Sequence, residues 1–139
     1  MRIDEFLLAR IAEDEADAQD ASDDGHRWLV EEETIGLWPD DRDPADGFMH
    51  FPRKAHAYHA ARWHPGRVLA ECEAKRAVMA EHALVPETYG WYMGKMADYG
   101  CGICDERDGL IYGAGPCPTV QTLAAVYADH PDYRPEWAG

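Results

Sequence analysis

The feature that most constrains this chain is a group of three cysteines within the stretch YGCGICDERDGLIYGAGPCPT, residues 99–119. Its Cys101-x-x-Cys104 pair fits three kinds of site: a redox couple, half of a covalent haem attachment site, or a metal knuckle. Each kind needs a different local context. The residues that flank the two thiols therefore distinguish among the three.

The flanking residues disfavour a redox couple and haem. A thioredoxin-like couple places its first cysteine at the start of a helix in a βαβ unit, where the helix N-terminus lowers the thiol pKa. Here Cys104 leads into the turn sequence Asp105-Glu-Arg-Asp-Gly109, whose acids are expected to raise the pKa of a neighbouring thiol. Haem attachment needs a histidine directly after the second cysteine, where this chain has Asp. A metal knuckle fits best, and a thiol oxidoreductase using the Cys101/Cys104 pair stays an alternative.

A structural zinc site needs two ligands beyond the knuckle, and Cys117 supplies the third after a glycine-rich return. Cys117 stands directly before Pro118, at the expected N-cap of a helix, where backbone N–H groups and the macrodipole stabilise a thiolate. Cys72 falls within a helix on its apolar stripe and is expected to be a small buried hydrophobe. His130 follows the other end of the helix that starts at Cys117, roughly 18 Å away, and is expected to interact with the helix dipole instead.

Elimination leaves His82 as the fourth ligand. It ends the predicted long helix where the chain loosens toward Cys101, so its ring can turn to the knuckle without strain. Three cysteines and one histidine saturate zinc and leave no position for water, which indicates a structural ion. Free thiols packed beneath aromatic residues and an iron–sulfur cluster stay open as alternatives. The predicted zinc ligands are His82, Cys101, Cys104 and Cys117.

A second histidine-rich stretch is the other candidate for chemistry. His56 and His59 would share one face if their segment were helical, and a second metal site or a metal-dependent hydrolase stays an alternative. No Asp or Glu occurs between Phe48 and Glu71, however, to complete a mixed histidine and carboxylate ligand set. The sequence also contains no nucleophile elbow, P-loop or dinucleotide-binding glycine pattern, so it offers no positive sign of an enzyme. The histidines of this cluster are His50, His56, His59 and His64.

The charge of the chain is uneven. Residues 1–47 hold sixteen acidic and four basic residues, a net −12 of the formal −14 of the whole chain. A field of that sign repels phosphates, so direct nucleic-acid binding is not expected and the expected partner is a basic protein. One version is mimicry of nucleic acid, with carboxylates imitating phosphates. The simpler interpretation is that acidic helices keep a small protein soluble.

The apolar segments are short. No stretch approaches eighteen consecutive apolar residues, and the N-terminal apolar run is brief and flanked by charges, so neither a membrane span nor a signal peptide is expected. We therefore expect a cytoplasmic protein, in which four cysteines serve as metal ligands or free thiols rather than disulfides.

Periodicity and turn signals predict the α+β class. We expect a small single domain with three main helices, a small antiparallel β-sheet and a zinc knuckle. Ile3, Leu7 and Ile11 recur at helical spacing, and the clearest helix begins at Pro65. Residues 53–63 are helical or irregular, and residues 84–100 carry no clear pattern. The predicted segments are an acidic helix at 1–22, the sheet at 26–52, the long helix at 65–83, the knuckle at 99–119, a C-terminal helix at 118–129 and an extended tail at 131–139.

Several motifs together resemble one family. They are His59-Ala-Ala-Arg62, Pro65-x-Arg67-Val68-Leu69, Glu71-x-Glu73-Ala74-Lys75-Arg76, the cysteine set, and the tail Tyr127-Ala-Asp-His-Pro-Asp-Tyr-Arg-Pro-Glu-Trp137. The chain is similar to a family of small acidic proteins of unknown function from actinobacteria and their phages, most closely over residues 56–137. The resemblance implies a ligand histidine at position 82 and an actinobacterial or phage origin, and it brings no established activity. With such an origin, the basic partner expected from the charge would be a host or phage protein. His64 stands where the family has a helix-capping Asp.

Overall fold

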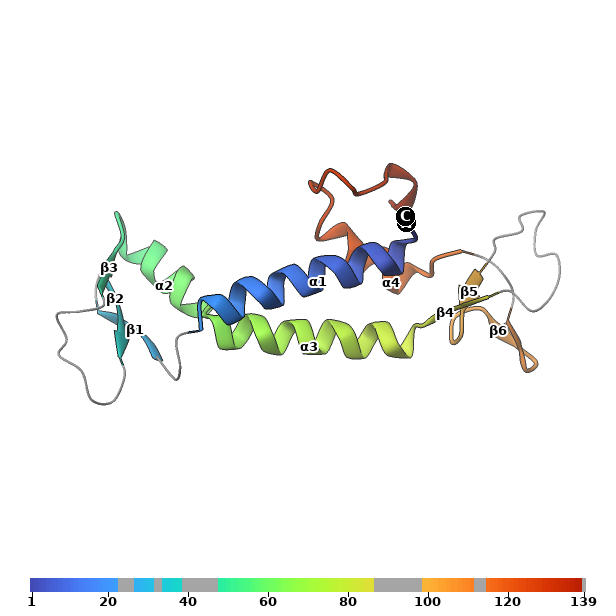
Figure 1. Cartoon of the computed structure of the whole chain (residues 1–139), viewed down its shortest axis with the longest axis horizontal. Coiled ribbons are helices and arrows are strands. Elements are labelled where there is room, and N and C mark those ends of the chain that lie inside the picture. Colours follow the sequence, from blue (N-terminus) through green and yellow to red (C-terminus); the bar gives the residue numbers. More distant parts are fainter. Residues whose placement is uncertain (23–26, 32–33, 39–47, 87–98, 112–114, 139) are drawn as a thin grey trace. The chain divides into compact units, whose positions relative to one another are not determined.

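The computed structural model describes residues 1–22, 27–31, 34–38, 48–86, 99–111 and 115–138. It confirms the α+β class, with α-helices and small antiparallel sheets (Figure 1). The three predicted helices are present as α1 (Ile3–Asp20), α3 (Pro65–Glu81) and α4 (Pro118–Ala125). A fourth, α2 (Lys54–Arg62), forms in the segment whose sequence left helix and irregular structure open.

The chain forms two compact units. One comprises Met1–Ala12 and Glu73–Gly139, and the other comprises Glu13–Cys72. Both divisions fall inside the continuous helices α1 and α3, whereas a boundary between domains normally falls in an exposed linker. The prediction of one small domain therefore stands, and the two units are described in turn.

The unit at 13–72 contains the sheet predicted for 26–52. Strands β1 (Arg27–Glu31), β2 (Thr34–Trp38) and β3 (Phe48–His50) pair antiparallel in that order. Helix α2 contacts β1 and β2 and lies beside the sheet in Figure 1. Ala57 of α2 and Ile35 of β2 are buried, so burial of small and β-branched apolar side chains holds helix to sheet.

The junction of α2 and α3 shows how a histidine replaces the expected capping Asp. Pro65 occupies the first position of α3, where its missing N–H costs nothing. The N–H of Arg67 donates to Nδ1 of His64 over 3.3 Å, which is the bond that an N-cap side chain makes. His64 therefore caps α3 through its ring.

The core of the other unit is built on one face of α1. Ile3, Phe6, Leu7 and Ile11 are fully buried, as their helical spacing predicts. Met79 from α3 and Val120 and Ala124 from α4 are also buried in this unit. Because apolar side chains at positions i, i+3, i+4 and i+8 face one way, α1 can bury them all against its neighbours.

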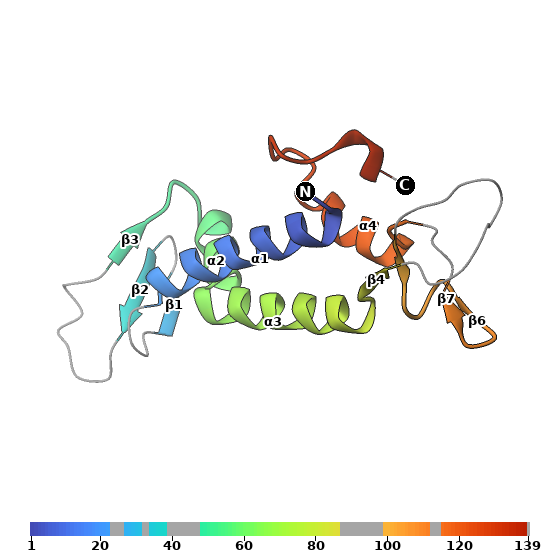
Figure 2. The same cartoon turned by 45° about the vertical axis from the view of Figure 1, so that its right-hand side comes forward.

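The prediction of an extended C-terminal tail is wrong. After α4 the chain passes through turns into the 3₁₀-helix η2 (Pro135–Trp137), beside the first turns of α1 (Figure 2). Trp137 is buried, and the centroid of its ring lies 5.0 Å from that of Phe6. The prolines exclude a long α-helix but permit a 3₁₀ turn, and burial of aromatic rings around Phe6 curls the tail.

The end of α4 also differs from the prediction. The helix stops at Ala125, so residues 126–129 belong to turns rather than to a helix reaching 129. His130 does not serve the helix dipole: its ring Nδ1 lies 2.9 Å from Nη1 of Arg10 on α1. A contact between residues 120 positions apart decided the role of this histidine, and no local pattern could reveal it.

Two small strand pairs complete this unit. Strand β4 (Leu84–Pro86) pairs antiparallel with β5 (Tyr99–Cys101). Strands β6 (Glu106–Arg107) and β7 (Leu110–Ile111) form a hairpin whose turn residues, Asp108 and Gly109, have φ of 53° and 78°. Positive φ at both turn positions defines the type I′ turn favoured in two-residue hairpins. Strand β5 and the turn that follows it place Cys101 and Cys104.

Candidate metal centre

The four predicted zinc ligands come from three elements of one unit. His82 directly follows α3, with its N–H donating to the carbonyl of Val78 over 3.0 Å. Cys101 is the last residue of β5, and Cys104 lies in the turn that follows. Cys117 is the N-cap of α4, as predicted, and its side chain makes no capping bond, which leaves the sulfur for the site.

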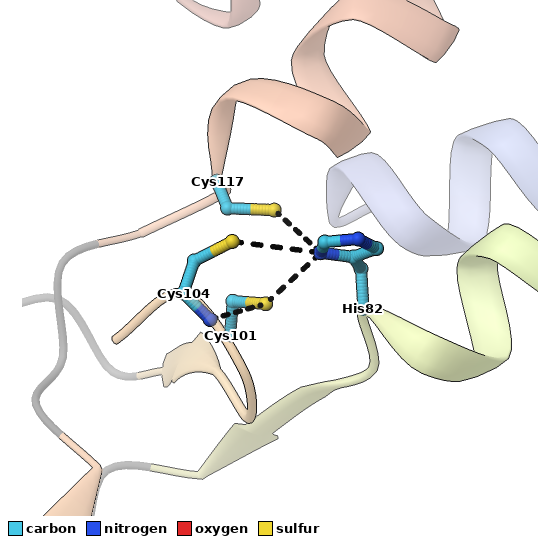
Figure 3. Close-up of side chains that lie close together, drawn as sticks. All are labelled: His82, Cys101, Cys104 and Cys117. Carbon is cyan, nitrogen blue, oxygen red and sulfur yellow. Dashed lines mark hydrogen bonds between the residues drawn. The ribbon is translucent and has the colours of Figure 1, made fainter. Parts of the chain in front are cut away.

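The structure brings the four side chains together (Figure 3). Nδ1 of His82 lies 3.6 Å from Sγ of Cys101, 3.5 Å from Sγ of Cys104 and 3.7 Å from Sγ of Cys117. The four ligand atoms all lie within 4.8 Å of one another. The imidazole Nδ1 carries at most one proton and can donate only one hydrogen bond. Hydrogen bonding therefore accounts for only one of these three similar N···S contacts.

This spacing fits a tetrahedral metal ion. With metal–sulfur bonds of about 2.3 Å and metal–nitrogen bonds of about 2.0–2.1 Å, a tetrahedral angle separates nitrogen from sulfur by about 3.6 Å. The three distances from His82 lie within 0.1 Å of that value. The cluster is therefore compatible with a metal site of three thiolates and one imidazole.

Backbone groups fix the Cys101 sulfur. The N–H of Cys104 donates to Sγ of Cys101 over 3.3 Å, and the sequence spacing of the knuckle sets this contact. A thiolate that accepts such bonds is oriented and electrostatically stabilised, which is the role of the outer shell around a metal.

Asp105 closes the knuckle turn, a role that the sequence analysis did not predict. It was expected only to disturb the thiols, yet its Oδ2 accepts the N–H of Cys101 over 2.6 Å and its own N–H donates to the Cys101 carbonyl over 3.0 Å. The two bonds close the knuckle turn. An Asp directly after a C-x-x-C pair is the signal that could have indicated this, because Asp side chains readily bond to nearby backbone N–H groups.

Pairing of β4 with β5 brings the histidine to the cysteines. Leu84 stands opposite Cys101 in this pair, and the N–H of Gly102 donates to the carbonyl of Ala83 over 3.0 Å. His82, which follows the last residue of α3 and stands two residues before β4, is thereby held close to the paired strands. This long-range pairing explains how residues 19 positions apart share one site.

The thiols have unequal proton affinities. Burial raises the pKa of the Cys101 thiol, but the backbone N–H groups of Cys104 and Ile103 and the ring of His82 outweigh burial and bring that pKa to about 7. The pKa of Cys104 rises to about 12 through desolvation of its sulfur and through its bonds to Cys101 and Cys117. Because Cys104 is exposed as a residue, we attribute most of the rise to the neighbouring sulfurs. Because the sulfurs lie close together, loss of a proton from one thiol makes loss of a proton from its neighbour less favourable, and a bound cation would remove this penalty.

Comparison with known proteins assigns the chain to a family. A family model described as a family of unknown function, DUF6221, matches residues 1–139. The chain belongs to the DUF6221 family. No curated protein and no solved structure matches this DUF6221 chain. The family assignment agrees with the resemblance to a family of unknown function, and the actinobacterial or phage origin stays a prediction.

The other candidate ligands of this DUF6221 protein lie elsewhere. Cys72 is fully buried in α3, as expected of a small hydrophobe. Within the described part of the chain, the group of His82 with the three cysteines is the only set of three or more ligand-type side chains close enough to hold an ion. The second metal site considered for His50, His56, His59 and His64 is thus not formed among the described residues.

The context of a redox couple is also not met at the knuckle. Cys101 is fully buried and Cys104 is exposed, whereas a thioredoxin-like couple exposes its first cysteine at a helix N-terminus. The chain continues from Cys104 into the hairpin β6–β7 rather than a helix. The aromatic residues Tyr89, Trp91 and Tyr92 lie outside the described residues. Among the described helices of this DUF6221 chain, none is both long and apolar enough to span a bilayer.

Proposed function

We propose that this protein is a non-enzymatic interaction module whose fold is stapled by one structural zinc ion. The observation that carries the zinc assignment is the approach of His82 Nδ1 to all three cysteine sulfurs at 3.5–3.7 Å. Thiolates and an imidazole are the ligands that zinc prefers in closed structural sites. Four protein ligands leave no position for a substrate or water, which supports a structural role.

The four ligands would join three separate elements of one unit. His82 belongs to the end of α3, Cys101 and Cys104 to the β5 turn, and Cys117 to the start of α4. The strands β4 and β5 have three residues each and are too short to be stable alone. Zinc binding to structural sites supplies about 10–16 kcal/mol, which is enough to order such a knuckle.

The metal proposal is tested by measuring the metal content of the purified full chain. We expect one zinc per chain by elemental analysis, and the absorption spectrum of tetrahedral thiolate coordination after replacement by cobalt. Thiol titration should find the three site cysteines protected until a chelator is added. A chain that contains no zinc, or one whose Cys101 and Cys104 react freely in the zinc-loaded state, would overturn the proposal and favour the alternative, a thiol oxidoreductase.

The surface for the partner is proposed on the second half of α1. Glu13, Asp17 and Asp20 are exposed at positions i, i+4 and i+7, so they share one side of the helix. The remaining acids of residues 23–46 fall mostly outside the described residues. Three carboxylates in a row, in a segment of strong negative charge, favour a basic protein as partner. We name Glu13, Asp17 and Asp20 the acidic α1 face.

The partner proposal is tested by affinity purification from an actinobacterial host with the wild-type chain and a Glu13→Gln/Asp17→Asn/Asp20→Asn variant as baits. Basic proteins should be retained by the wild-type chain and lost from the variant or at high salt. If the acidic α1 face imitates nucleic acid, added DNA should compete for the same proteins. Partners retained equally by both baits and indifferent to salt would contradict the proposal.

A further inference from the structure

Helix α2 lies in the longest stretch of this acidic protein that contains no Asp or Glu, and that stretch carries positive charge. Residues 48–70 contain four basic residues and no Asp or Glu, although the whole chain has 27 acids against 13 bases. The basic residues are Arg53, Lys54, Arg62 and Arg67. This local reversal of sign is independent of the metal centre and of the acidic α1 face.

The charges share one side of the helix with aromatic rings. Lys54, Tyr58 and Arg62 follow one another at intervals of four residues, and His59 and Trp63 form the adjacent row. A surface hollow of about 530 Å³ is lined by Lys54, Ala55, Tyr58, His59 and Arg62. The opposite side of α2 buries Ala57 against the sheet, so this side is turned to solvent. We name Lys54, Tyr58, His59, Arg62 and Trp63 the α2 face.

The cations of the α2 face, Lys54 and Arg62, have no carboxylate partner in the part of the chain that the structure describes. Nearby Arg67, by contrast, pairs with Glu71 over 2.8 Å. A chain with two acids for every base could readily supply partners. Two exposed cations left in this way, over a hollow, attract an anion from solution.

The rings of the α2 face are unusually open for their size. Tyr58 is 51% exposed and Trp63 is 43% exposed. The ammonium of Lys54 lies 5.7 Å from the centroid of the Tyr58 ring, and the guanidinium of Arg67 lies 4.2 Å from that of Trp63. Exposed rings interleaved with cations form the surface on which proteins stack the bases and hold the phosphates of a single strand.

We propose that the α2 face binds single-stranded nucleic acid, with Lys54 and Arg62 at phosphates and Tyr58 and Trp63 beneath bases. A duplex would engage the cations only, because its bases stay stacked on one another, so the exposed rings favour a single strand. The net charge of the chain weakens binding at long range, but salt at physiological concentration screens charges beyond roughly 8 Å. The earlier expectation against direct nucleic-acid binding rests on residues 1–47 and does not apply to this segment.

The test is fluorescence anisotropy of labelled oligo-dT and oligo-U, with a duplex of mixed sequence as comparison, titrated with the zinc-loaded full chain. Single strands should bind at least about tenfold more tightly than the duplex, with affinity falling as salt rises. The Lys54→Ala/Arg62→Ala variant should lower the slope of log affinity against log salt by about 1.4, since each phosphate contact on a single strand contributes about 0.7.

Variants of the ring separate stacking from charge. Tyr58→Ala should weaken binding about tenfold, and Tyr58→Phe should keep it, because base stacking needs the ring and not the hydroxyl. Arg107→Ala removes an exposed cation from β6 and is the matched control, which should leave binding and salt slope unchanged. Zinc content and circular dichroism verify the fold of each variant.

Three results would overturn the proposal. They are no binding of single strands at low salt, a duplex bound as tightly as a single strand, and affinities unaffected by the Lys54→Ala/Arg62→Ala variant. Self-association that depends on Lys54 and Arg62, without nucleic-acid binding, would instead assign the α2 face to the acidic surface of a second copy. Each result is independent of whether the acidic α1 face binds a basic protein.

Discussion

The ring of Phe6 in α1 packs against that of Trp137 in η2, with the two centroids 5.0 Å apart. Three further rings of the tail surround Phe6: those of Tyr127, His130 and Tyr133, at 5.7–6.4 Å. The guanidinium of Arg10 lies 5.4 Å from the centroid of Phe6, on the same helix. The first and last segments of the chain therefore form one aromatic core, and the tail is part of the fold.

Truncating this aromatic core should destabilise the protein strongly. Trp137 is 5% exposed, and Trp137→Ala should lower the free energy of unfolding by about 3–5 kcal/mol through lost burial and the cavity left behind. Urea denaturation of the zinc-loaded chain measures the change. Val126→Ala is the control, because Val126 is 69% exposed, and its effect should stay within about 0.5 kcal/mol. Equal effects of the two substitutions would show that the tail does not pack on α1.

Replacing a site cysteine should abolish zinc binding, and replacing the fourth cysteine should not. Cys117→Ser should yield a chain without zinc, and Cys72→Ala should keep one zinc per chain, because Cys72 lies outside the cluster. Added zinc at a thousand times its Kd should stabilise the wild type and Cys72→Ala by about 4 kcal/mol and leave Cys117→Ser unchanged. Elemental analysis and thermal unfolding with and without chelator provide the readouts. Loss of zinc from Cys72→Ala alone would reject the assigned ligand set.

Zinc affinity should fall more steeply below pH 7 than above it. Zinc displaces protons from its thiol ligands, so affinity decreases wherever a ligand is protonated in the metal-free chain. Cys104, with a pKa of about 12, must release a proton throughout the accessible range. Cys101, with a pKa of about 7, adds one further proton only below that value. The slope of log affinity against pH should therefore increase by about one on acidification through pH 7.

Calorimetry in buffers of different ionisation enthalpy counts the protons released on zinc binding. The contribution of Cys101 to the count should rise by about 0.8 between pH 8 and pH 6 as this thiol becomes protonated, since its pKa is about 7. Cys72→Ala, which removes a thiol outside the cluster, is the control and should show the same rise. A proton count that stays constant across this interval would contradict the ordering of the two thiols.

Restoring an acidic cap should stabilise α3. His64 caps the helix through a bond of 3.3 Å from the N–H of Arg67, and a carboxylate accepts such a bond more strongly and complements the helix dipole. His64→Asp should raise the free energy of unfolding by about 0.5–1 kcal/mol. His64→Ala, which removes the cap, should lower it by a similar amount. Urea denaturation of the wild type, His64→Asp and His64→Ala ranks their free energies of unfolding. Equal values, or the reverse ranking, would show that residue 64 does not cap the helix.

The grouping of His82 with three cysteines could be predicted from the sequence because spacing restricts which of these residues can meet. The C-x-x-C turn, the N-cap position of Cys117 and the mid-helix position of Cys72 follow from local geometry, which needs no knowledge of the fold. The structure adds Asp105, whose role depends on the turn that it closes. The pairing of β4 with β5, which carries His82 to the cysteines, lies beyond any local pattern because these strands are only three residues long.

The sequence by itself determined the three main helices, the antiparallel sheet at 26–52 and the identity of the four clustered side chains, since periodicity, turn residues and spacing act over a few neighbouring positions. Only the tertiary structure decided that the tail folds back on Phe6, that His130 meets Arg10, and that α2 turns a basic and aromatic side to solvent. The physical reason is burial. Apolar rings leave water wherever partners are available, and those partners lie more than a hundred residues away along the chain.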